Sequence, residues 1–448
     1  MEKMADKSSG PGGMGQVPSP GMAGVHPGMA GVDPGPPGVK IDLIRQVAPV
    51  RAERAPQPRV VVAGHFCLDI FPDLSKIPEG QFLHLFKPGH MVITGPIFFG
   101  TGGAAANTSL ALHRLGIPTH MIAKIGNDPL GAIARAVVQR SGLELATGII
   151  TTPDAATAYT VIISPPGVDR IFMACTGAND SFGANDIDFR LLEEAAVFHF
   201  GYPPVLQKFY QHGGRELVDL LHRAKKTGVT TSLDLTLPDP AGPAGQVDWL
   251  AVLGACLPSV DIFLPSVEEL LFMLRRKTYD VLQEAAGGES LLKLVTPELL
   301  HSLSAQMLEM GVKIAGLKLG ERGFYMRTAG EKAMAGMGRG QPPEPAAWAD
   351  QTLWAPAYEV IVAGTTGAGD AAIAGFISGL LRGLDPRRAL SAAAGVGACN
   401  VEALDGLSGL LSWEDTLGRI AAGWKQRPLD LNPAEWDWDA GSGVWVGK

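Results

Sequence analysis

The sequence predicts an α/β protein, a three-layer α/β/α domain with a mostly parallel sheet and a smaller β-sheet lid. Short apolar runs that end at glycine, such as 59–64, alternate with longer amphipathic stretches. Such alternation is typical of parallel strands covered by helices on both faces. Two other stretches, 71–99 and 158–175, carry Pro and Gly without an intervening helix, which indicates short strands that close over one end of the domain.

The periodicity of the apolar residues then assigns each element. We expect strands at 59–64, 120–124, 197–200, 230–235, 261–264, 313–319 and 360–362. We expect helices at 105–115, 130–141, 206–226, 267–275, 368–382 and 386–401. The region 328–356 is rich in Gly, Pro and Ala, which predicts a surface excursion. The two lid stretches are expected to form a small antiparallel sheet.

Composition divides the chain into three parts. Residues 1–57 are rich in Gly, Pro and Met and repeat one motif at 20–26 and 27–33. Such a segment lacks the apolar side chains that offset chain entropy, so we expect it to be disordered and without catalytic role. Residues 58–425 form the predicted globular domain. Residues 426–448 form a tail whose tryptophans, with Trp424 just before it, are expected to pin it against the domain.

Charge and composition exclude several classes of protein. The net charge is −8, the pI is about 5.7, and no run of Lys or Arg is long enough to bind along a phosphate backbone. Neither nucleic acid nor a membrane surface is therefore an expected partner. No apolar stretch reaches the length of a membrane span, and no secretory signal is visible. The four cysteines are far apart, which argues against a zinc site or a disulfide framework. These features predict a cytoplasmic enzyme.

The segment Gly364-Thr-Thr-Gly-Ala-Gly-Asp370 lies between an apolar run and an alanine-rich helix. Glycines at such a turn expose backbone N–H groups at the positive end of a helix, which favours a phosphate-like anion. An aspartate just inside the turn can accept a hydroxyl proton during phosphoryl transfer. The alternative interpretation is a tight turn with an Asp in the first helical turn.

A second segment, Gly102-Gly-Ala-Ala-Ala-Asn107, also begins a helix. Asn107 in its first turns and Asp69 after the first strand carry the polar groups that can hold a polyol or ribose. The alternative is a helix start capped by polar residues. His65 lies close to Asp69 in the sequence, and we consider it a weaker candidate for the same site.

In this order and at this separation, the two segments resemble the PfkB (ribokinase-like) carbohydrate kinase family, over 59–411. Further landmarks lie at 169–172, 177–179 and 319–323. The resemblance implies an ATP- and Mg²⁺-dependent phosphotransferase that acts on a hydroxyl of a small sugar or sugar derivative. It implies the following roles: Asp370 as general base, Gly367, Ala368 and Gly369 as anion hole, Asp69, Gly102, Gly103 and Asn107 for the acceptor, Lys318, Gly320, Gly323, Thr366 and Asn400 for the nucleotide, and Glu269 near the metal. Paired lids often form dimers in that family, so a homodimer through the lid is expected.

Three positions depart from the family pattern. Gly364 stands where the family usually has an Asp that helps to build a monovalent-cation site, which leaves potassium activation open. Ser266-Val-Glu-Glu269 has Ser where the family has Asn, and Asp234-Leu-Thr236 ends in Thr where the family has Asn. Two alternatives therefore stay beside the sugar kinase: a nucleoside kinase of the same fold, and a non-catalytic homologue that binds nucleotide or sugar. A dinucleotide fingerprint at 100–105 lacks the strand and acidic residue that would support it, and no P-loop is present.

Overall fold

The computed structural model describes residues 60–448, except 80, 82–86 and 167–170. The expected disorder of 1–57 therefore lies outside the described residues, as do Asp169 and Arg170 of one family-like landmark. Within the described part of the chain, no helix is long and apolar enough to cross a bilayer.

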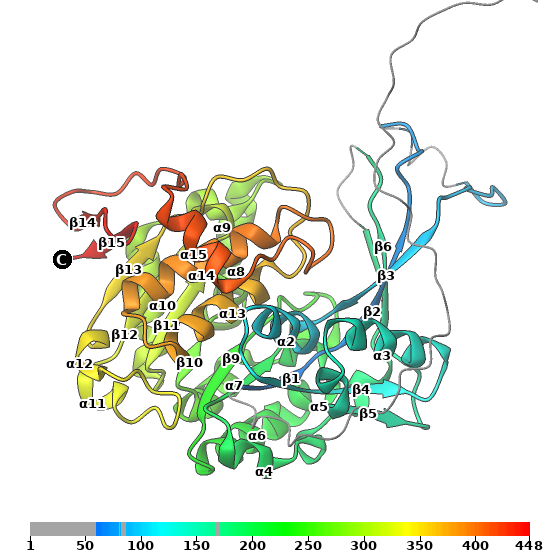
Figure 1. Cartoon of the computed structure of the whole chain (residues 1–448), viewed down its shortest axis with the longest axis horizontal. Coiled ribbons are helices and arrows are strands. Elements are labelled where there is room, and N and C mark those ends of the chain that lie inside the picture. The colour runs from blue at the N-terminus through cyan, green and yellow to red at the C-terminus, as the bar shows by residue number, and fades with distance from the viewer. Residues whose placement is uncertain (1–59, 80, 82–86, 167–170) are drawn as a thin grey trace, which may run out of the picture. The chain divides into compact units, whose positions relative to one another are not determined.

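A large sheet of 11 strands forms the middle layer, in the order β14-β15-β13-β12-β11-β10-β9-β8-β1-β4-β5 (Figure 1). Its strands are β1 (Val60–Gly64), β4 (Thr119–Gly126), β5 (Ile149–Thr152), β8 (Val197–Gly201), β9 (Thr230–Asp234), β10 (Ile262–Phe263), β11 (Ile314–Lys318), β12 (Phe324–Thr328), β13 (Thr352–Ala355), β14 (Trp436–Asp439) and β15 (Val444–Gly447). The strands from β11 to β5 pair in parallel, whereas β12, β13, β15 and β14 add antiparallel strands at one edge.

Helices cover both faces of this sheet because side chains alternate across each strand. In β1, Val61 and Ala63 belong to one core cluster, and Val60 and Val62 belong to the other. The first core includes α6 (Arg215–Lys226), α7 (Trp249–Cys256), α8 (Val267–Leu274) and α10 (Pro297–Glu309). The second includes α2 (Ala104–Arg114), α13 (Ala368–Leu381) and α14 (Pro386–Asn400). The remaining α-helices are α3 (Pro129–Ser141), α4 (Phe189–Glu194), α5 (Gln207–Tyr210), α9 (Arg276–Ala286), α11 (Glu331–Met334), α12 (Pro345–Trp348) and α15 (Trp413–Ala421). The predicted three-layer arrangement is confirmed.

A separate sheet of four strands forms the lid, in the order β3-β2-β6-β7. Its strands are β2 (Cys67–Pro72), β3 (Ile97–Gly102), β6 (Tyr159–Ile163) and β7 (Ile171–Cys175). They project beyond the helical layers in Figure 1. Two of the three pairings are antiparallel as expected, but β2 and β6 run parallel. The expectation of a wholly antiparallel lid is therefore wrong.

Three other expectations about local structure are also wrong. The predicted helix 206–226 is interrupted, because His212, Gly213 and Gly214 take positive φ angles and separate α5 from α6. The apolar run 360–362 is not a strand but an irregular segment, with Ile361 90% exposed. The predicted surface excursion 328–356 contains β13 and the buried side chains of Trp348 and Trp354.

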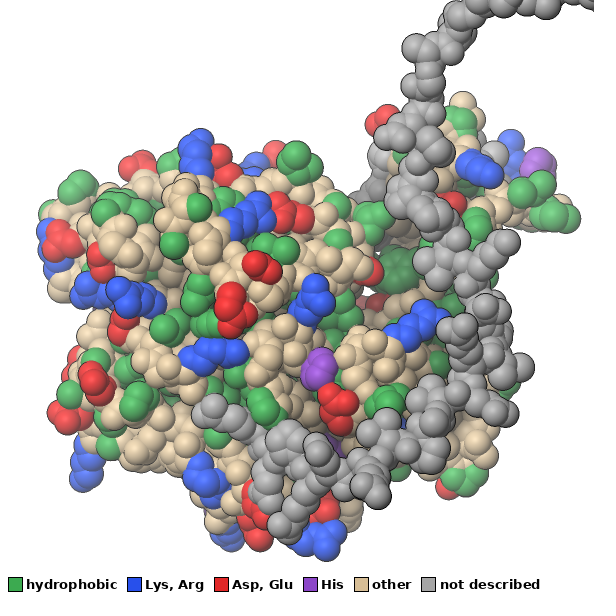
Figure 2. All heavy atoms as spheres, in the orientation of Figure 1, with side chains coloured by type: hydrophobic (Ala, Val, Ile, Leu, Met, Phe, Trp, Pro, Cys, Tyr) green, Lys and Arg blue, Asp and Glu red, His purple; other side chains and the backbone are tan. Residues whose placement is uncertain are grey.

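The C-terminal hairpin of β14 and β15 extends the sheet by pairing β15 with β13. Trp436 is buried there, with its ring 6.1 Å from Trp354 and 6.3 Å from Tyr325. On the face shown in Figure 2, basic and acidic side chains are intermingled over the helices. Hydrophobic side chains are visible at the outer part of the lid.

Candidate active site

Asp370 lies in the first turn of α13, and its side chain is completely buried. Its Oδ2 atom accepts a hydrogen bond of 2.9 Å from Asn107 Nδ2, on α2, and one of 3.0 Å from the Tyr202 hydroxyl. Its Oδ1 atom accepts none from the described residues. Burial raises the pKa of Asp370, and the nearby Lys318 charge and the bonds from Asn107 and Tyr202 oppose the rise. A buried carboxylate with one unused oxygen can accept a proton.

Four strands end around this carboxylate. β1 leads to His65, β8 leads to Tyr202, β9 ends at Asp234 and β11 ends at Lys318. These strands are parallel and lie close together in the sheet, so their carboxyl ends share one edge. Ligands of open α/β sheets bind at that edge.

Lys318 is the cation of a cluster of charged side chains that also contains Asp234, Glu269 and Asp370. Its Nζ atom bonds Asp234 Oδ1 at 2.6 Å, and both side chains are almost wholly buried. Burial disfavours the ammonium, but the carboxylates of Asp234, Glu269 and Asp370 outweigh it and raise the pKa of Lys318. A Cβ atom at Gly369 would lie 3.3 Å from Lys318 Nζ, so the ammonium adjoins the first turn of α13. The Lys318 ammonium therefore compensates two buried carboxyl groups, Asp234 and Asp370, and the half-buried Glu269, and it adjoins the glycine turn.

That turn contains the predicted anion hole. Gly367 is the N-cap of α13, with φ 72° and ψ 2°, a conformation that glycine adopts at little cost. It supplies no side-chain cap. Because the first N–H groups of a helix lack helical partners, those of Gly369 and Asp370 can receive an anion, while the N–H of Ala368 donates to Thr365 at 3.3 Å. The half-buried Thr366 immediately precedes this turn.

The predicted acceptor residues gather where the lid meets α2. Asp69 lies in β2 opposite Gly100 of β3, and a Cβ atom at Gly102 would lie 2.5 Å from Asp69 Oδ2. Gly102 therefore makes room for the carboxylate. Burial raises the pKa of Asp69 to about 6, although a bond from Cys67 Sγ, 3.3 Å from Oδ1, opposes the rise.

Gly103 follows with φ 87° and is the N-cap of α2, the helix that carries Asn107. A Cβ atom there would collide with the backbone oxygen of His65 at 2.3 Å and its Nδ1 at 2.5 Å. His65 is half-buried, its buried Nδ1 has no partner among the described residues, and desolvation of the ring lowers its pKa to about 4. Asn107 Oδ1 also lacks a described partner. Neutral polar groups thus line the space beside Asp69.

The predicted nucleotide residues form a second group. Gly320 and Gly323 have φ angles of 52° and 90° and bound the tight turn between β11 and β12. Glu321 and Arg322 of this turn line a surface pocket of about 570 Å³. The other lining residues are Glu359, Val360, Arg427, Pro428 and Leu429. Part of the predicted tail therefore forms one wall of this pocket, where Arg427 pairs with Glu321 at 3.1 Å.

Asn400, at the end of α14, is buried and donates through Nδ2 to the Gly406 carbonyl. A Cβ atom at Gly406 would lie 3.4 Å from the Thr366 carbonyl and 3.6 Å from Asn107 Oδ1. Asn400 is thus tied to the loop that packs on the Gly367 turn, rather than lining the pocket beside Gly320.

Glu269 and Ser266 form the capping box of α8. Ser266 Oγ accepts from the Glu269 N–H at 3.2 Å, and Glu269 Oε2 accepts from the Ser266 N–H at 2.7 Å. Burial raises the pKa of Glu269, and Lys318 opposes the rise. Ser266 thus fixes Glu269 beside the cluster. At Gly364, a Cβ atom would approach the carbonyl oxygens of Ala403 and Leu404 to 3.0 Å.

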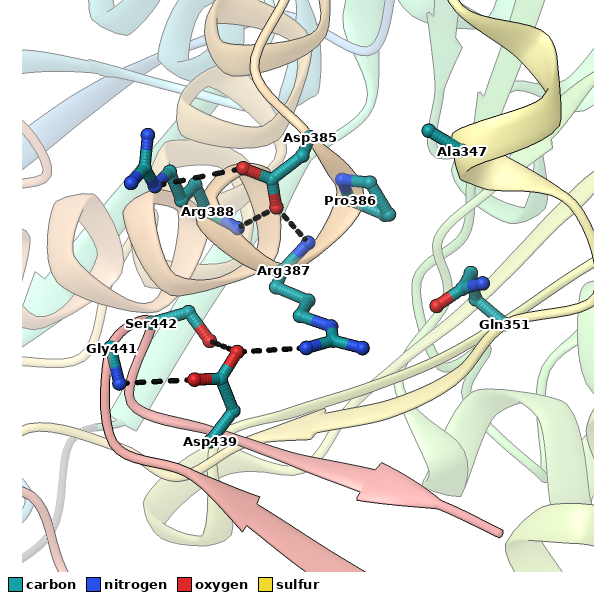
Figure 3. A pocket seen from close by; sticks show the side chains of 9 residues that line it. All are labelled: Ala347, Gln351, Asp385, Pro386, Arg387, Arg388, Asp439, Gly441 and Ser442. Carbon is teal, nitrogen blue, oxygen red and sulfur yellow. Dashed lines mark hydrogen bonds and ion pairs between the residues drawn. The ribbon is translucent and has the colours of Figure 1, made fainter.

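Another pocket, of about 540 Å³, lies between the C-terminal hairpin and the start of α14 (Figure 3). It carries Arg387 and Arg388, but Arg387 pairs with Asp439 at 3.0 Å and Arg388 with Asp385 at 3.6 Å. None of the predicted site residues lines it. Its cations are already compensated by their own neighbours, so it is a weaker site for an anion than the turn at Gly367.

Two features escaped the sequence analysis. Tyr202 was not a candidate, and its only signal is its place directly after the strand 197–201. Lys318 was expected to contact nucleotide, but its bond to Asp234, 84 positions away, was not foreseen. Both relationships depend on the neighbouring order of the strands, which periodicity does not give.

Comparison with known proteins gives the family. The model of the pfkB family of carbohydrate kinases matches residues 59–410. An uncharacterized sugar kinase of Archaeoglobus fulgidus is 24% identical over 62% of this chain and 88% of its own length. An ATP-dependent ribose-1-phosphate kinase of Halopiger xanaduensis is 24% identical over 76% of this chain and 90% of its own length.

Solved structures share the fold. Ribokinase of Arabidopsis thaliana, complexed with ribose and ATP, is 21% identical with a TM-score of 0.56, over 81% of this chain and 98% of that one. A protein of E. coli described as a ribokinase II, in complex with ATP and Mg²⁺, is 22% identical with a TM-score of 0.60, over 82% of this chain and 99% of that one. The family match spans almost the whole described domain and both glycine segments, and the chain therefore belongs to the pfkB family of carbohydrate kinases.

Proposed function

We propose that this protein transfers the γ-phosphoryl group of ATP to a hydroxyl group of a small neutral sugar. The observation that carries the proposal is the buried Asp370 at the N-terminus of α13, with one oxygen held and the other unused. In this proposal Asp370 takes the proton of the acceptor hydroxyl. The predicted anion hole at Gly367, Ala368 and Gly369 stabilises the charge on the transferring group through the first N–H groups of α13, those of Gly369 and Asp370.

Lys318 is the phosphate-binding cation in this proposal. Its Nζ atom adjoins Gly369 and forms an ion pair with Asp234. When the γ-phosphate binds at the turn, a second anion comes within reach of the same ammonium. A point charge on a flexible stem can serve both, as lysines at phosphate sites do.

The nucleotide binds along the same edge. We infer that the pocket beside Gly320 and Gly323 takes the base and ribose, because Val360 and Leu429 give it apolar surface. Thr366, which directly precedes the turn at Gly367, would contact the nucleotide phosphates. Asn400 acts by holding the loop at Gly406 against the turn.

Mg²⁺ fits this arrangement. It is usually held by substrate phosphates and one or two carboxylates, and Asp234 Oδ2 is a buried oxygen without a partner among the described residues. Glu269, fixed by Ser266, would hold a water of the metal's shell. When bound, Mg²⁺ neutralises charge on the phosphates.

The acceptor is held by Asp69, Asn107 and the backbone at Gly102 and Gly103. Asp69 favours neutral polyols, because a buried carboxylate accepts hydroxyl hydrogens and repels acidic or phosphorylated sugars. A nucleoside acceptor is the second candidate, favoured by the stacked rings of His65 and Tyr202, 6.3 Å apart. A purely binding role is less favoured, because a binder has no need of a base beside an anion hole.

The lid also suggests self-association. The side chains of Ile97, Phe98 and Ile171 to Met173 are 42–60% exposed, on the two outer strands of the lid sheet. Edge strands that carry exposed apolar side chains favour pairing with another chain. We propose a homodimer through the lid. Light scattering of Phe98→Ser should then report a smaller particle than the wild type, and an unchanged monomer in both would contradict the dimer.

The deciding experiment measures ADP release from Mg·ATP with neutral sugars, sugar acids, sugar phosphates and nucleosides. We expect turnover with one neutral sugar. Asp370→Asn should lower kcat by about 10²–10⁴-fold and leave ATP binding intact, whereas Asp280→Asn, on the exposed face of α9, should change nothing. Turnover that survives Asp370→Asn would exclude Asp370 as the base. ATP binding without turnover would favour the binding protein.

A further inference from the structure

We propose that Tyr202 is a positioning residue: together with Asn107 it holds Oδ2 of Asp370, so that Oδ1 is the atom that takes the acceptor's proton. This inference rests on the proposed function. It adds a residue that no sequence motif contains, and it assigns the two oxygens of one carboxylate to different tasks.

The geometry separates the two oxygens. Oδ2 receives both the 2.9 Å bond from Asn107 and the 3.0 Å bond from Tyr202. Oδ1 is buried and receives none from the described residues. A carboxylate oxygen that already accepts two hydrogen bonds has little capacity for another. The oxygen with unused lone pairs is therefore the one available to a substrate hydroxyl.

The two donors come from different elements of the fold. Asn107 lies on α2, and a Cβ atom at Gly367 would be 3.4 Å from its amide. Tyr202 follows β8, and its N–H donates to the Asp234 carbonyl at 3.2 Å. Two donors from separate elements restrict rotation of the carboxylate more than either alone, since each fixes one direction.

The backbone of Tyr202 supports a functional role. Its φ is 65° and its ψ is 44°, in the left-handed region that few residues with a Cβ atom adopt. Only three described residues other than glycine have positive φ, and Tyr202 is the one that contacts the cluster. Such conformations persist where the surroundings enforce them, and they concentrate at functional sites. This conformation delivers the phenol to Asp370.

Tyr202 remains a donor across the working pH range. Burial, followed by the charges of Asp370, Asp234 and Glu269, raises its pKa well above the usual value. The phenol is therefore not a base itself. It can only donate to Asp370 or, if displaced, to the substrate.

The proton transfer is balanced as follows. The acceptor hydroxyl loses its proton to Asp370 Oδ1, and its oxygen forms a bond to the γ-phosphorus. The bond between that phosphorus and the β,γ-bridging oxygen breaks, and its electron pair leaves with ADP. A carboxylate fixed through Oδ2 has its proton-accepting lone pair already directed, which saves reorganisation in the transition state.

Charged and titratable groups face Asp370 from every element of the site. They are Lys318 from β11, Asp234 from β9 and Tyr202 after β8, with the polar Asn107 and Thr108 on α2 and with Glu269 on α8 beside Lys318. Of the neutral hydroxyl groups here, that of Tyr202 bonds the carboxylate at 3.0 Å, while the nearby Thr108 hydroxyl also lowers the pKa of Asp370 without a hydrogen bond of normal geometry. Tyr202→Phe removes that bond and keeps the ring. It should therefore raise the pKa of Asp370, since a hydrogen bond to a carboxylate favours its charged form.

The test compares Tyr202→Phe with Tyr358→Phe. Tyr358 is the matched control, because its buried hydroxyl bonds Ser391 Oγ at 2.7 Å and its ring stacks on Trp424. We expect Tyr202→Phe to lower kcat about tenfold or more, as loss of a bond to a charged group does. We expect KM for acceptor and for Mg·ATP to change little, and the acidic limb of the kcat profile to move to higher pH. Tyr358→Phe should change none of these.

A second readout does not depend on turnover. In protein labelled with ¹³C at the Asp carboxyl groups, the Asp370 signal is identified by its loss in Asp370→Asn. It should titrate at higher pH in Tyr202→Phe than in wild type or Tyr358→Phe. A titration shift without turnover would retain the positioning role and reject the kinase. Turnover with an unshifted carboxyl signal, or a change confined to KM for the acceptor, would overturn the positioning role.

Discussion

Asn107 and Asp370 lie 263 positions apart in the chain, and the amide of one donates a 2.9 Å hydrogen bond to the carboxylate of the other. The bond joins the first turns of α2 and α13, the two helices that begin at the glycine segments. The two motifs that identify the family by sequence are thus one unit in space.

Asn107→Asp should change the pH dependence of kcat more than Asn107→Ala does. The new carboxylate would face Asp370 at hydrogen-bond distance, and like charges at that distance cannot both ionise. The pair should bind a proton at higher pH, so the acidic limb of the kcat profile should move upward in Asn107→Asp and less in Asn107→Ala. The pH dependence of kcat for both variants measures this, and equal profiles would show that the amide does not affect the base.

Lys318→Met should weaken both ATP binding and the fold. The buried Asp234 and Asp370 and the half-buried Glu269 lose their cation, and breaking a buried pair costs ~3–5 kcal/mol. Burial raises the pKa of Asp234 above its unfolded value, so stability from this group is present below the unfolded pKa and is lost as pH rises. The variant should therefore unfold in less urea at pH 8 than at pH 5.

The exposed Lys277→Met on α9 is the control for that experiment. A double variant, Asp234→Asn with Lys318→Met, should recover part of the lost stability, because it removes one of the uncompensated charges. If the double variant is no more stable than Lys318→Met, the loss of stability does not come from the unpaired charge of Asp234.

Acceptor binding should weaken below about pH 6. Burial raises the pKa of Asp69 to about 6, and the protonated carboxyl accepts fewer hydroxyl hydrogens than the carboxylate. KM for the acceptor should rise as pH falls through 6, while KM for Mg·ATP stays level. Asp69→Asn should have a high KM that no longer varies over this range. A wild-type KM that is flat from pH 5 to 8 would contradict the role of Asp69.

Gly102→Ala should raise KM for the acceptor about tenfold or more, because a displaced contact near the reacting group is costly. Its Cβ atom would lie 2.5 Å from Asp69 Oδ2 and must push the carboxylate aside. Gly254→Ala on α7 is the control, since a Cβ atom there meets nothing within 4 Å. Thermal unfolding checks that both variants keep the fold, and an unchanged KM in Gly102→Ala would place the acceptor elsewhere.

Much of this fold could be predicted because its strands are short apolar runs and its helices have clear starts. The expected helix 130–141 matches α3, whose Asp128 caps it and whose Pro129 begins it. The run 360–362 failed because an apolar pattern does not distinguish a strand from an exposed loop. The helix 206–226 failed because the Gly213-Gly214 pair adopts positive φ angles that end one helix before the next begins.

Only those site residues that belong to a continuous sequence motif could be predicted. Gly367 to Asp370 and Gly102 to Asn107 carry their chemistry in consecutive residues, so a sequence pattern can find them. Tyr202 and the Asp234–Lys318 pair do not. Their contacts arise because β8, β9 and β11 end at one edge of the sheet, and the order of strands in space is not encoded in any local window.

The position of β1 has a consequence for how the molecule is assembled. This strand comes first among those described, yet it lies in the sheet between β8 and β4 and needs Val197–Gly201 as a partner. Contacts between distant segments form late and slow folding. Asp370 meets Asn107 only after this central pairing and α13 are both in place, so a partly folded chain has no complete catalytic group. Recovery of ATP turnover during refolding should therefore lag behind recovery of helical circular dichroism.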